Sequence, residues 1–175
     1  MAPKPPPNAI KETVVSVRPM SRSLTTAVNS ERSRLSGAAI DFFTVLVTNI
    51  GPAFEGLMPS SSRRSSAVHP PQQSLPVRAR QCLLTVIEYS QSPSVLSYFV
   101  ESVKDKSVSL RLSVAECALA CLNSLNTPDL EKEPRAREIE IIIRATATDA
   151  SADVRKVGRK VFEAYKLVLP SRVDK

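Results

Sequence analysis

The sequence predicts an all-α fold in which pairs of helices stack into an α–α superhelix. Apolar side chains recur at helical spacing over segments of helix length, and no long stretch alternates with the two-residue period of a strand. Short breaks rich in Ser, Asp and Pro separate these segments. One turn motif also occurs twice at a stride typical of helical repeats. Together, these observations favour an α-solenoid.

The breaks predict where each helix begins and ends. A first helical segment, 9–28, is expected to break or kink at Pro19 because proline lacks the backbone N–H. The apolar run 35–50 is expected to stop at Gly51-Pro52. Further helices are predicted at about 77–90, 94–104, 108–126, 134–148 and 152–168.

Two segments are predicted to be disordered. Residues 1–8 are Pro-rich. Residues 59–76 contain four prolines and six serines and are expected to form a disordered insert. Within that insert, Arg63-Arg64-Ser65-Ser66 resembles a basophilic kinase target. The remainder of 9–175 is interpreted as one repeat domain.

The repeated turn motif has Asp, then Ser two residues later, an aliphatic residue five later and Arg six later. It occurs at 105–111 and again at 149–155, so the stride is 155 − 111 = 44 residues. We assign Arg34 and Arg78, which are also 44 residues apart, to the same arginine position. This assignment predicts four helix pairs, each burying its apolar face against its neighbours.

Positive charge is concentrated in the first half of the chain. Residues 1–80 carry 10 Lys and Arg against 4 Asp and Glu, whereas residues 81–175 carry 14 against 13. A basic surface of this kind favours an acidic partner, although a basic disordered tail would give the same count. The basic residues lack interleaved aromatic side chains, so a nucleic-acid partner is not expected.

No pattern in the chain predicts catalysis or a cofactor. Cys82, Cys117 and Cys121 lack metal-ligand spacing and are expected to be reduced, intracellular core residues. The single histidine, His69, has no second ligand nearby in sequence. There is no phosphate-binding glycine loop and no nucleophile elbow. No apolar run reaches the ~18 residues that span a membrane, and no signal peptide is expected.

Three blocks carry a family resemblance: AVNSERSRLSGAAIDFF (27–43), VKDKSVSLRLSVAECAL (103–119) and DASADVRKVGRKVFEAYKLVLPSRV (149–173). They resemble a TOG-type domain, a paddle of HEAT repeats, of the CLASP family of microtubule-associated proteins. Four repeats are recognisable where that family has six, which implies an incomplete TOG paddle. The resemblance implies HEAT or armadillo-like packing with an Asp–Arg ladder, in which the Asp of one repeat meets the Arg of the next.

The resemblance also implies a function. TOG domains bind tubulin along the edge formed by the turns within each repeat. The family acts without catalysis in microtubule stabilisation and rescue at plus ends, spindles and kinetochores, within the cytoplasm and cytoskeleton. α/β-Tubulin or the microtubule is therefore the expected partner, with no small-molecule substrate and no membrane. The alternative is a HEAT-repeat scaffold for some other protein.

The candidate residues follow from the positions of the turns. Those expected to contact tubulin are Arg32, Arg34, Arg78, Lys104, Lys106, Ser107, Ser151, Arg155 and Lys156. Those expected to form the ladder are Asp105, Arg111, Asp149 and Arg155. Cations are disfavoured at helix starts, so those that are not ladder residues are expected either to contact an acidic partner or to be ordinary solvated charges.

Overall fold

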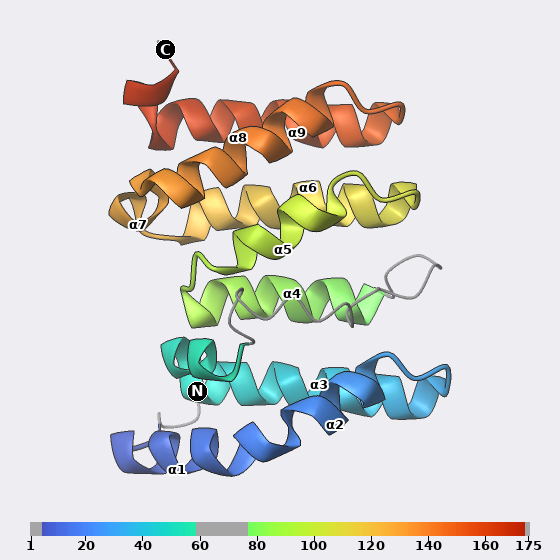
Figure 1. Cartoon of the computed structure of the whole chain (residues 1–175), viewed down its shortest axis with the longest axis vertical. Coiled ribbons are helices and arrows are strands. Elements are labelled where there is room, and N and C mark those ends of the chain that lie inside the picture. The colour runs from blue at the N-terminus through green and yellow to red at the C-terminus, as the bar shows by residue number, and fades with distance from the viewer. Residues whose placement is uncertain (1–4, 59–76, 174–175) are drawn as a thin grey trace. The chain divides into compact units, whose positions relative to one another are not determined.

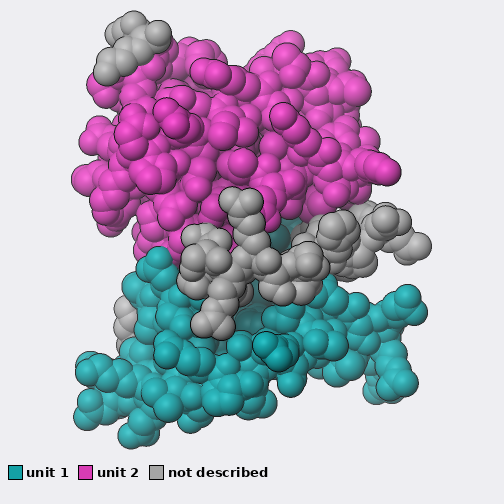
Figure 2. All heavy atoms as spheres, in the orientation of Figure 1, with its two compact units in different colours: residues 1–72, 76–90 teal, residues 73–75, 91–175 magenta. Residues whose placement is uncertain are grey.

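The computed structural model describes residues 5–58 and 77–173, and within those ranges every regular element is a helix (Figure 1). The all-α prediction is confirmed. The chain divides into two compact units, with residues 1–72 and 76–90 in unit 1 and residues 73–75 and 91–175 in unit 2 (Figure 2). Residues 1–4 of the expected N-terminal tail and the whole insert 59–76 lie outside the described part.

Unit 1 contains four α-helices and two 3-10 segments within its described residues. They are α1 (Pro7–Val17), η1 (Arg18–Met20), α2 (Ser21–Val28), α3 (Ser33–Ile50), η2 (Gly51–Leu57) and α4 (Val77–Ser90). Helix α1 begins two residues before the expected start of the first helical segment. The expected break near Pro19 is confirmed, because η1 separates α1 from α2 there.

Helix α3 is the central helix of unit 1 and packs against α2, α4 and η2. Its buried face includes Val47 and Ile50, which are nearly inaccessible, as is Ile87 of α4. Gly51 follows α3 with a φ of 54°, a conformation that L side chains rarely adopt. The α-helix therefore ends where Gly51-Pro52 predicted.

Helical structure nevertheless continues past Gly51 as η2. The resulting segment, Ser33–Leu57, has 25 residues and is the one helical segment among those described that is long and apolar enough to cross a membrane by length and composition. The sequence predicts no such segment, because its apolar run ends at Ile50, before Gly51-Pro52. A buried core helix has the same length and composition, and 39% of the most apolar window is buried here.

Five helices were predicted beyond the insert. The first of them is α4 in unit 1, and the other four lie in unit 2. Its described elements are α5 (Val95–Ser102), α6 (Val108–Ser124), α7 (Thr127–Glu131), α8 (Glu133–Ala147), α9 (Ala152–Val168) and η3 (Pro170–Arg172). The predicted boundaries are within two residues of the observed ones. The short helix α7 was not predicted.

Two layers of helices build unit 2. Helix α5 packs against α8 in one layer, α6 packs against α9 in the other, and each hairpin α5–α6 and α8–α9 joins the layers (Figure 1). The side chains of Leu96, Ile139 and Val161 are fully buried between them. Cys117 and Cys121 are fully buried in the same core, and burial raises the pKa of the Cys121 thiol. The first helices of the two hairpins pack together, and so do the second helices. The two hairpin turns of unit 2 therefore lie side by side.

Candidate binding edge at the helix turns

Both hairpin turns in unit 2 are built by the same side-chain contact. The Asp105 carboxylate accepts a hydrogen bond from the Ser107 backbone N–H (2.7 Å), and the Asp149 carboxylate accepts one from the Ser151 N–H (2.8 Å). Each serine then occupies the N-cap of the following helix, α6 or α9. In each hairpin, the Asp-x-Ser sequence therefore forms an Asx turn directly before the second helix begins.

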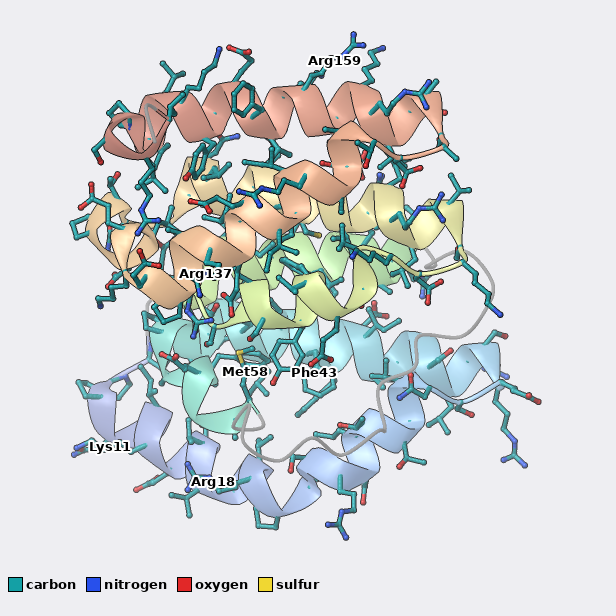
Figure 3. All side chains as sticks on the ribbon, turned by 45° about the horizontal axis from the view of Figure 1, so that its top comes forward. Lys11, Arg18, Phe43, Met58, Arg137 and Arg159 are labelled. Carbon is teal, nitrogen blue, oxygen red and sulfur yellow. The ribbon has the colours of Figure 1, made fainter. Side chains whose placement is uncertain are left out.

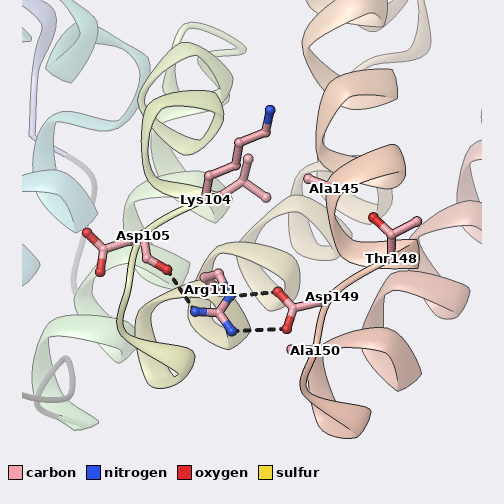
Figure 4. A pocket seen from close by; sticks show the side chains of 8 residues that line it. Lys104, Asp105, Arg111, Ala145, Thr148, Asp149 and Ala150 are labelled. Carbon is pink, nitrogen blue, oxygen red and sulfur yellow. Dashed lines mark hydrogen bonds and ion pairs between the residues drawn. The ribbon is translucent and has the colours of Figure 1, made fainter.

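Arg111 joins the two turns. Its Nε donates to Asp149 Oδ2 (2.6 Å) and its Nη2 donates to Oδ1 (3.0 Å), so the guanidinium holds the carboxylate at two points (Figure 4). Its Nη1 donates to the backbone carbonyls of Asp105 (2.7 Å) and Lys106 (3.1 Å) in its own turn. The arginine therefore fixes its own turn and the neighbouring one together.

The contact is largely shielded from solvent. The side chain of Arg111 is 13% exposed and that of Asp149 is 6% exposed. Hydrogen bonding to Arg111 lowers the pKa of the Asp149 carboxyl, and the same bond raises the pKa of Arg111. Both groups are therefore charged near neutral pH.

The ladder runs in the opposite direction to the one expected. The arginine of one repeat meets the aspartate of the following repeat, and no contact joins Asp105 to Arg155 among the described residues. The reason is that Nη1 binds the carbonyls of the arginine's own turn, which leaves Nε and Nη2 directed toward the next turn. Arg155 likewise donates through Nη1 to the carbonyls of Asp149 (2.6 Å) and Ala150 (2.8 Å).

The turn before α3 has the same backbone form, with serine in place of both the ladder aspartate and the ladder arginine. Ser30 Oγ accepts a hydrogen bond from the Arg32 N–H (3.2 Å), and the backbone N–H of Ser36 bonds to the Arg32 carbonyl as that of Arg111 bonds to the Ser107 carbonyl. Ser36, not Arg34, therefore occupies the ladder position. The assignment of Arg34 to that position was wrong by two residues.

Arg78 also differs from the ladder arginines. It lies at the second residue of α4 and pairs with Asp41, a residue inside α3, at 3.8 Å. Both side chains are about two-thirds exposed, so the pair contributes little to stability. The predicted ladder therefore has one Arg–Asp contact in unit 2, between Arg111 and Asp149, which we call the rung. The described part of unit 1 has no contact of the same kind.

The remaining cations predicted to bind tubulin lie at the turns of their own units. Arg32, Arg34, Lys104, Lys106 and Lys156 are exposed. In unit 2, an open hollow of about 300 Å³ lies between the two turns, lined by Lys104, Arg111 and Asp149 together with Thr148, the residue that follows α8 (Figure 4). Ser107 and Ser151 are half-buried N-cap residues, and the Ser107 hydroxyl accepts a hydrogen bond from the Leu110 N–H (3.4 Å).

Sequence reasoning missed Gly158 in the middle of α9. A Cβ at this position would lie 2.7 Å from Thr146 Oγ1 and 2.8 Å from Thr146 Cβ. Glycine therefore permits the close approach of α8 and α9 at this position. A glycine inside a strongly amphipathic helix was the available signal.

A second cluster holds the other ends of α8 and α9. Tyr165 Oη donates to Glu140 Oε1 (2.9 Å), and Arg172 of η3 donates to Glu140 (3.3 Å) and Glu133 (2.6 Å). Among the described residues, no group of three or more His, Cys, Asp or Glu side chains could hold a metal ion.

A family model described as CLASP N terminal matches residues 3–175 of the chain. The match spans both units and all of the turns described above. No curated protein matches the sequence.

Proposed function

Because this chain belongs to the CLASP N-terminal family, we propose that it is a non-catalytic module that binds tubulin or microtubules through the turns of its helix pairs. The observation that supports this proposal is the charge at the paired turns of unit 2. Lys104 and Lys106 are exposed there, and neither ammonium group has a carboxylate partner among the described residues. An acidic protein surface would supply that partner.

The Arg111–Asp149 contact orders the turn that carries Lys104 and Lys106, which favours binding through these lysines. Arg111 and Asp149 neutralise each other and fix the two turns, so the lysines project from a backbone that is already ordered. Preordered cations lose less entropy on binding, and charge-assisted contacts strengthen the complex. Tubulin is strongly acidic, so such an edge would both steer the encounter and hold the complex.

The proposed role is that of the family. Bound at the microtubule, the chain would stabilise the polymer and favour rescue at plus ends, at the spindle and at kinetochores. It would then be found in the cytoplasm on the microtubule cytoskeleton. We propose no small-molecule substrate, membrane or nucleic acid as its partner.

Two binding measurements on the purified chain test the proposal. Co-sedimentation with microtubules measures binding to the polymer, and gel filtration with free tubulin measures binding to the dimer. We expect binding in at least one assay at low salt, weakening as ionic strength rises because the contacts are between charges. Absence of binding in both assays at low salt would reject tubulin as the partner and favour a scaffold for another protein.

A further inference from the structure

The chain contains two Ser/Thr-Pro dipeptides, Ser92-Pro93 and Thr127-Pro128. Protein kinases of the proline-directed class modify a hydroxyl that is followed directly by proline, so each dipeptide is a minimal substrate motif. The first lies just before α5. The second begins α7, which connects the α5–α6 pair to the α8–α9 pair and so lies inside unit 2. The motif alone does not distinguish the two hydroxyls.

Exposure in the folded chain does distinguish them. Ser92 is 1% exposed, and its hydroxyl is hydrogen-bonded to that of Ser94 (2.5 Å). Thr127 is exposed, and its hydroxyl makes no hydrogen bond within residues 5–58 and 77–173. An enzyme can therefore reach the Thr127 hydroxyl in the native fold, whereas Ser92 becomes accessible only after local unfolding.

Thr127 is also unlike the other threonines that the structure describes. The hydroxyl of each of the others donates to a backbone carbonyl three or four residues earlier, because a helical turn precedes it. They are Thr13, Thr25, Thr26, Thr44, Thr48, Thr85, Thr146 and Thr148. Thr127 is the first residue of α7, and α6 ends at Ser124, so no helical carbonyl lies in reach of its hydroxyl.

The backbone around Thr127 suits a kinase, whose active site holds its substrate in an extended conformation. Leu125 and Asn126 are already extended, with ψ of 155° and 130°. The Asp129 and Leu130 N–H groups close the first turn of α7 on one carbonyl, that of Asn126 (3.0 and 3.3 Å). Asn126 gives α7 no side-chain cap, and a five-residue helix is marginal by itself. Opening this turn therefore breaks few contacts.

We propose that Thr127 is a phosphorylation site for a proline-directed kinase. Thr127 Oγ attacks the γ-phosphorus of ATP, the bond from that phosphorus to the β–γ bridging oxygen breaks, and ADP leaves with the electron pair of that bond. The hydroxyl proton passes to a carboxylate of the kinase. This site does not depend on tubulin being the partner of the chain.

The phosphate would mark the edge of unit 2 that lies opposite the two hairpin turns (Figure 1). Helix α6 begins at the α5–α6 turn, and its 17 residues are about 25 Å long. This length exceeds the Debye length of about 8 Å, so the roughly two negative charges of the phosphate are screened from the turn. Close by, the phosphate joins the carboxylates of Asp129 and Glu131 and makes the α7 edge more acidic.

Phosphorylation of the whole folded chain tests the proposal, with ATP and either a purified mitogen-activated protein kinase or a cyclin-dependent kinase. Mass spectrometry of proteolytic peptides gives the rate at each hydroxyl. Thr127 should be modified at least about tenfold faster than Ser92, because a buried hydroxyl must wait for local unfolding. Pro128→Ala is the matched control, since it keeps the exposed hydroxyl, removes the motif and should abolish the modification.

Backbone NMR signals report where the phosphate acts. The amide signals of residues 125–133 should shift on phosphorylation, whereas those of residues 103–108 at the α5–α6 turn should stay in place. Shifts of equal size at the turn would contradict the separation of the two edges. Neither this measurement nor the phosphate mapping uses tubulin, so the outcome is independent of the proposed function.

Three results of the kinase assay would overturn the proposal. An unmodified Thr127 with both kinases would mean that α7 withholds the hydroxyl. Equal rates at Ser92 and Thr127 would mean that exposure in the fold does not select the site. Undiminished modification of the Pro128→Ala variant would exclude a proline-directed kinase. Circular dichroism and the melting temperature establish that the variant is folded.

Discussion

Arg111 of α6 holds Asp149 of the α8–α9 turn at two points, across 38 residues of sequence. This contact joins one helix pair to the next within unit 2. Because the same arginine also binds the carbonyls of its own turn, a single guanidinium orders both turns on which the candidate lysines lie. Stability of the unit and geometry of the binding edge are therefore linked through one residue pair.

The contribution of the Arg111–Asp149 pair to the free energy of unfolding should decrease at acid pH. Asp149 has a lowered pKa when folded, so the stability it contributes is present above the unfolded value of about 3.9 and is lost as pH falls through the folded pKa. Asp149→Asn should lower the free energy of unfolding by about 2–3 kcal/mol at pH 7, and by less at pH 3. Urea unfolding at pH 3 to 7 measures the difference.

Asp105→Asn is the matched control. Asp105 accepts from the Ser107 N–H, as Asp149 does from that of Ser151, but its side chain receives no guanidinium. Asparagine can keep the turn bond, so the loss should be under about 1 kcal/mol at pH 7. If both variants lose the same amount at pH 7, the turn bond, and not the rung, provides the stability.

Gly158→Ala should destabilise unit 2 even though alanine favours helices. The added Cβ would meet Thr146 Oγ1 at 2.7 Å and the Thr146 backbone carbon at 3.2 Å, and Thr146 is fully buried. We expect a loss of about 1–3 kcal/mol by thermal or urea unfolding. Gly56→Ala is the control, because its Cβ would lie 3.6 Å from the nearest atom, Arg18 Nη2. Equal stability of both variants would contradict the close approach of α8 and α9.

Helix boundaries were predictable because they depend on local chemistry. Helices α6 and α9 begin at the predicted residues, 108 and 152, directly after Ser107 and Ser151, and the first helical segment is interrupted at Pro19 as predicted. Helix α7 was missed because its five residues are too short for a hydrophobic period.

The details of the edge were less predictable because they depend on contacts between distant segments. A sequence offset of 44 residues placed Arg34 in the ladder, yet backbone bonding places Ser36 there. The spacing from Ser30 to Ser36 matches that from Asp105 to Arg111, and serine can replace aspartate in the turn but not in the ion pair. The ladder's direction depends on which guanidinium nitrogen binds its own turn, and spacing does not encode that.

Reversing the charge at the α5–α6 turn should abolish most binding to tubulin. Lys104→Glu with Lys106→Glu places two anions at the proposed contact, and like charges there repel an acidic partner. We expect at least about a tenfold loss of affinity in co-sedimentation. The melting temperature should change by less than about 3 °C, because exposed side chains contribute little to folding.

Lys132→Glu with Arg137→Glu makes the same charge change elsewhere in unit 2. Both residues are exposed, and they lie near the start of α8, at the opposite end from the α8–α9 turn. Arg137 is labelled in Figure 3. The variant also removes the exposed Lys132–Asp129 ion pair (2.7 Å), which contributes little to stability. It should bind tubulin within about threefold of the unaltered chain, since the altered charges are screened and distant from the α5–α6 turn. Equal losses in both double variants would mean that net charge, and not the turn, determines binding.

The Tyr165–Glu140 contact should make the fold sensitive to alkali. Burial, together with the hydrogen bond to Glu140, raises the pKa of Tyr165 to about 12. The unfolded phenol titrates near 10, so this contribution is complete below about pH 10 and is lost as pH rises toward 12. In urea unfolding from pH 8 to 11.5, the unaltered chain should lose stability above pH 10. Tyr165→Phe should be about 1 kcal/mol less stable at pH 8 and should lose less on going to high pH, because phenylalanine has no proton to release. Parallel pH profiles for the two proteins would show that other groups cause the alkaline loss.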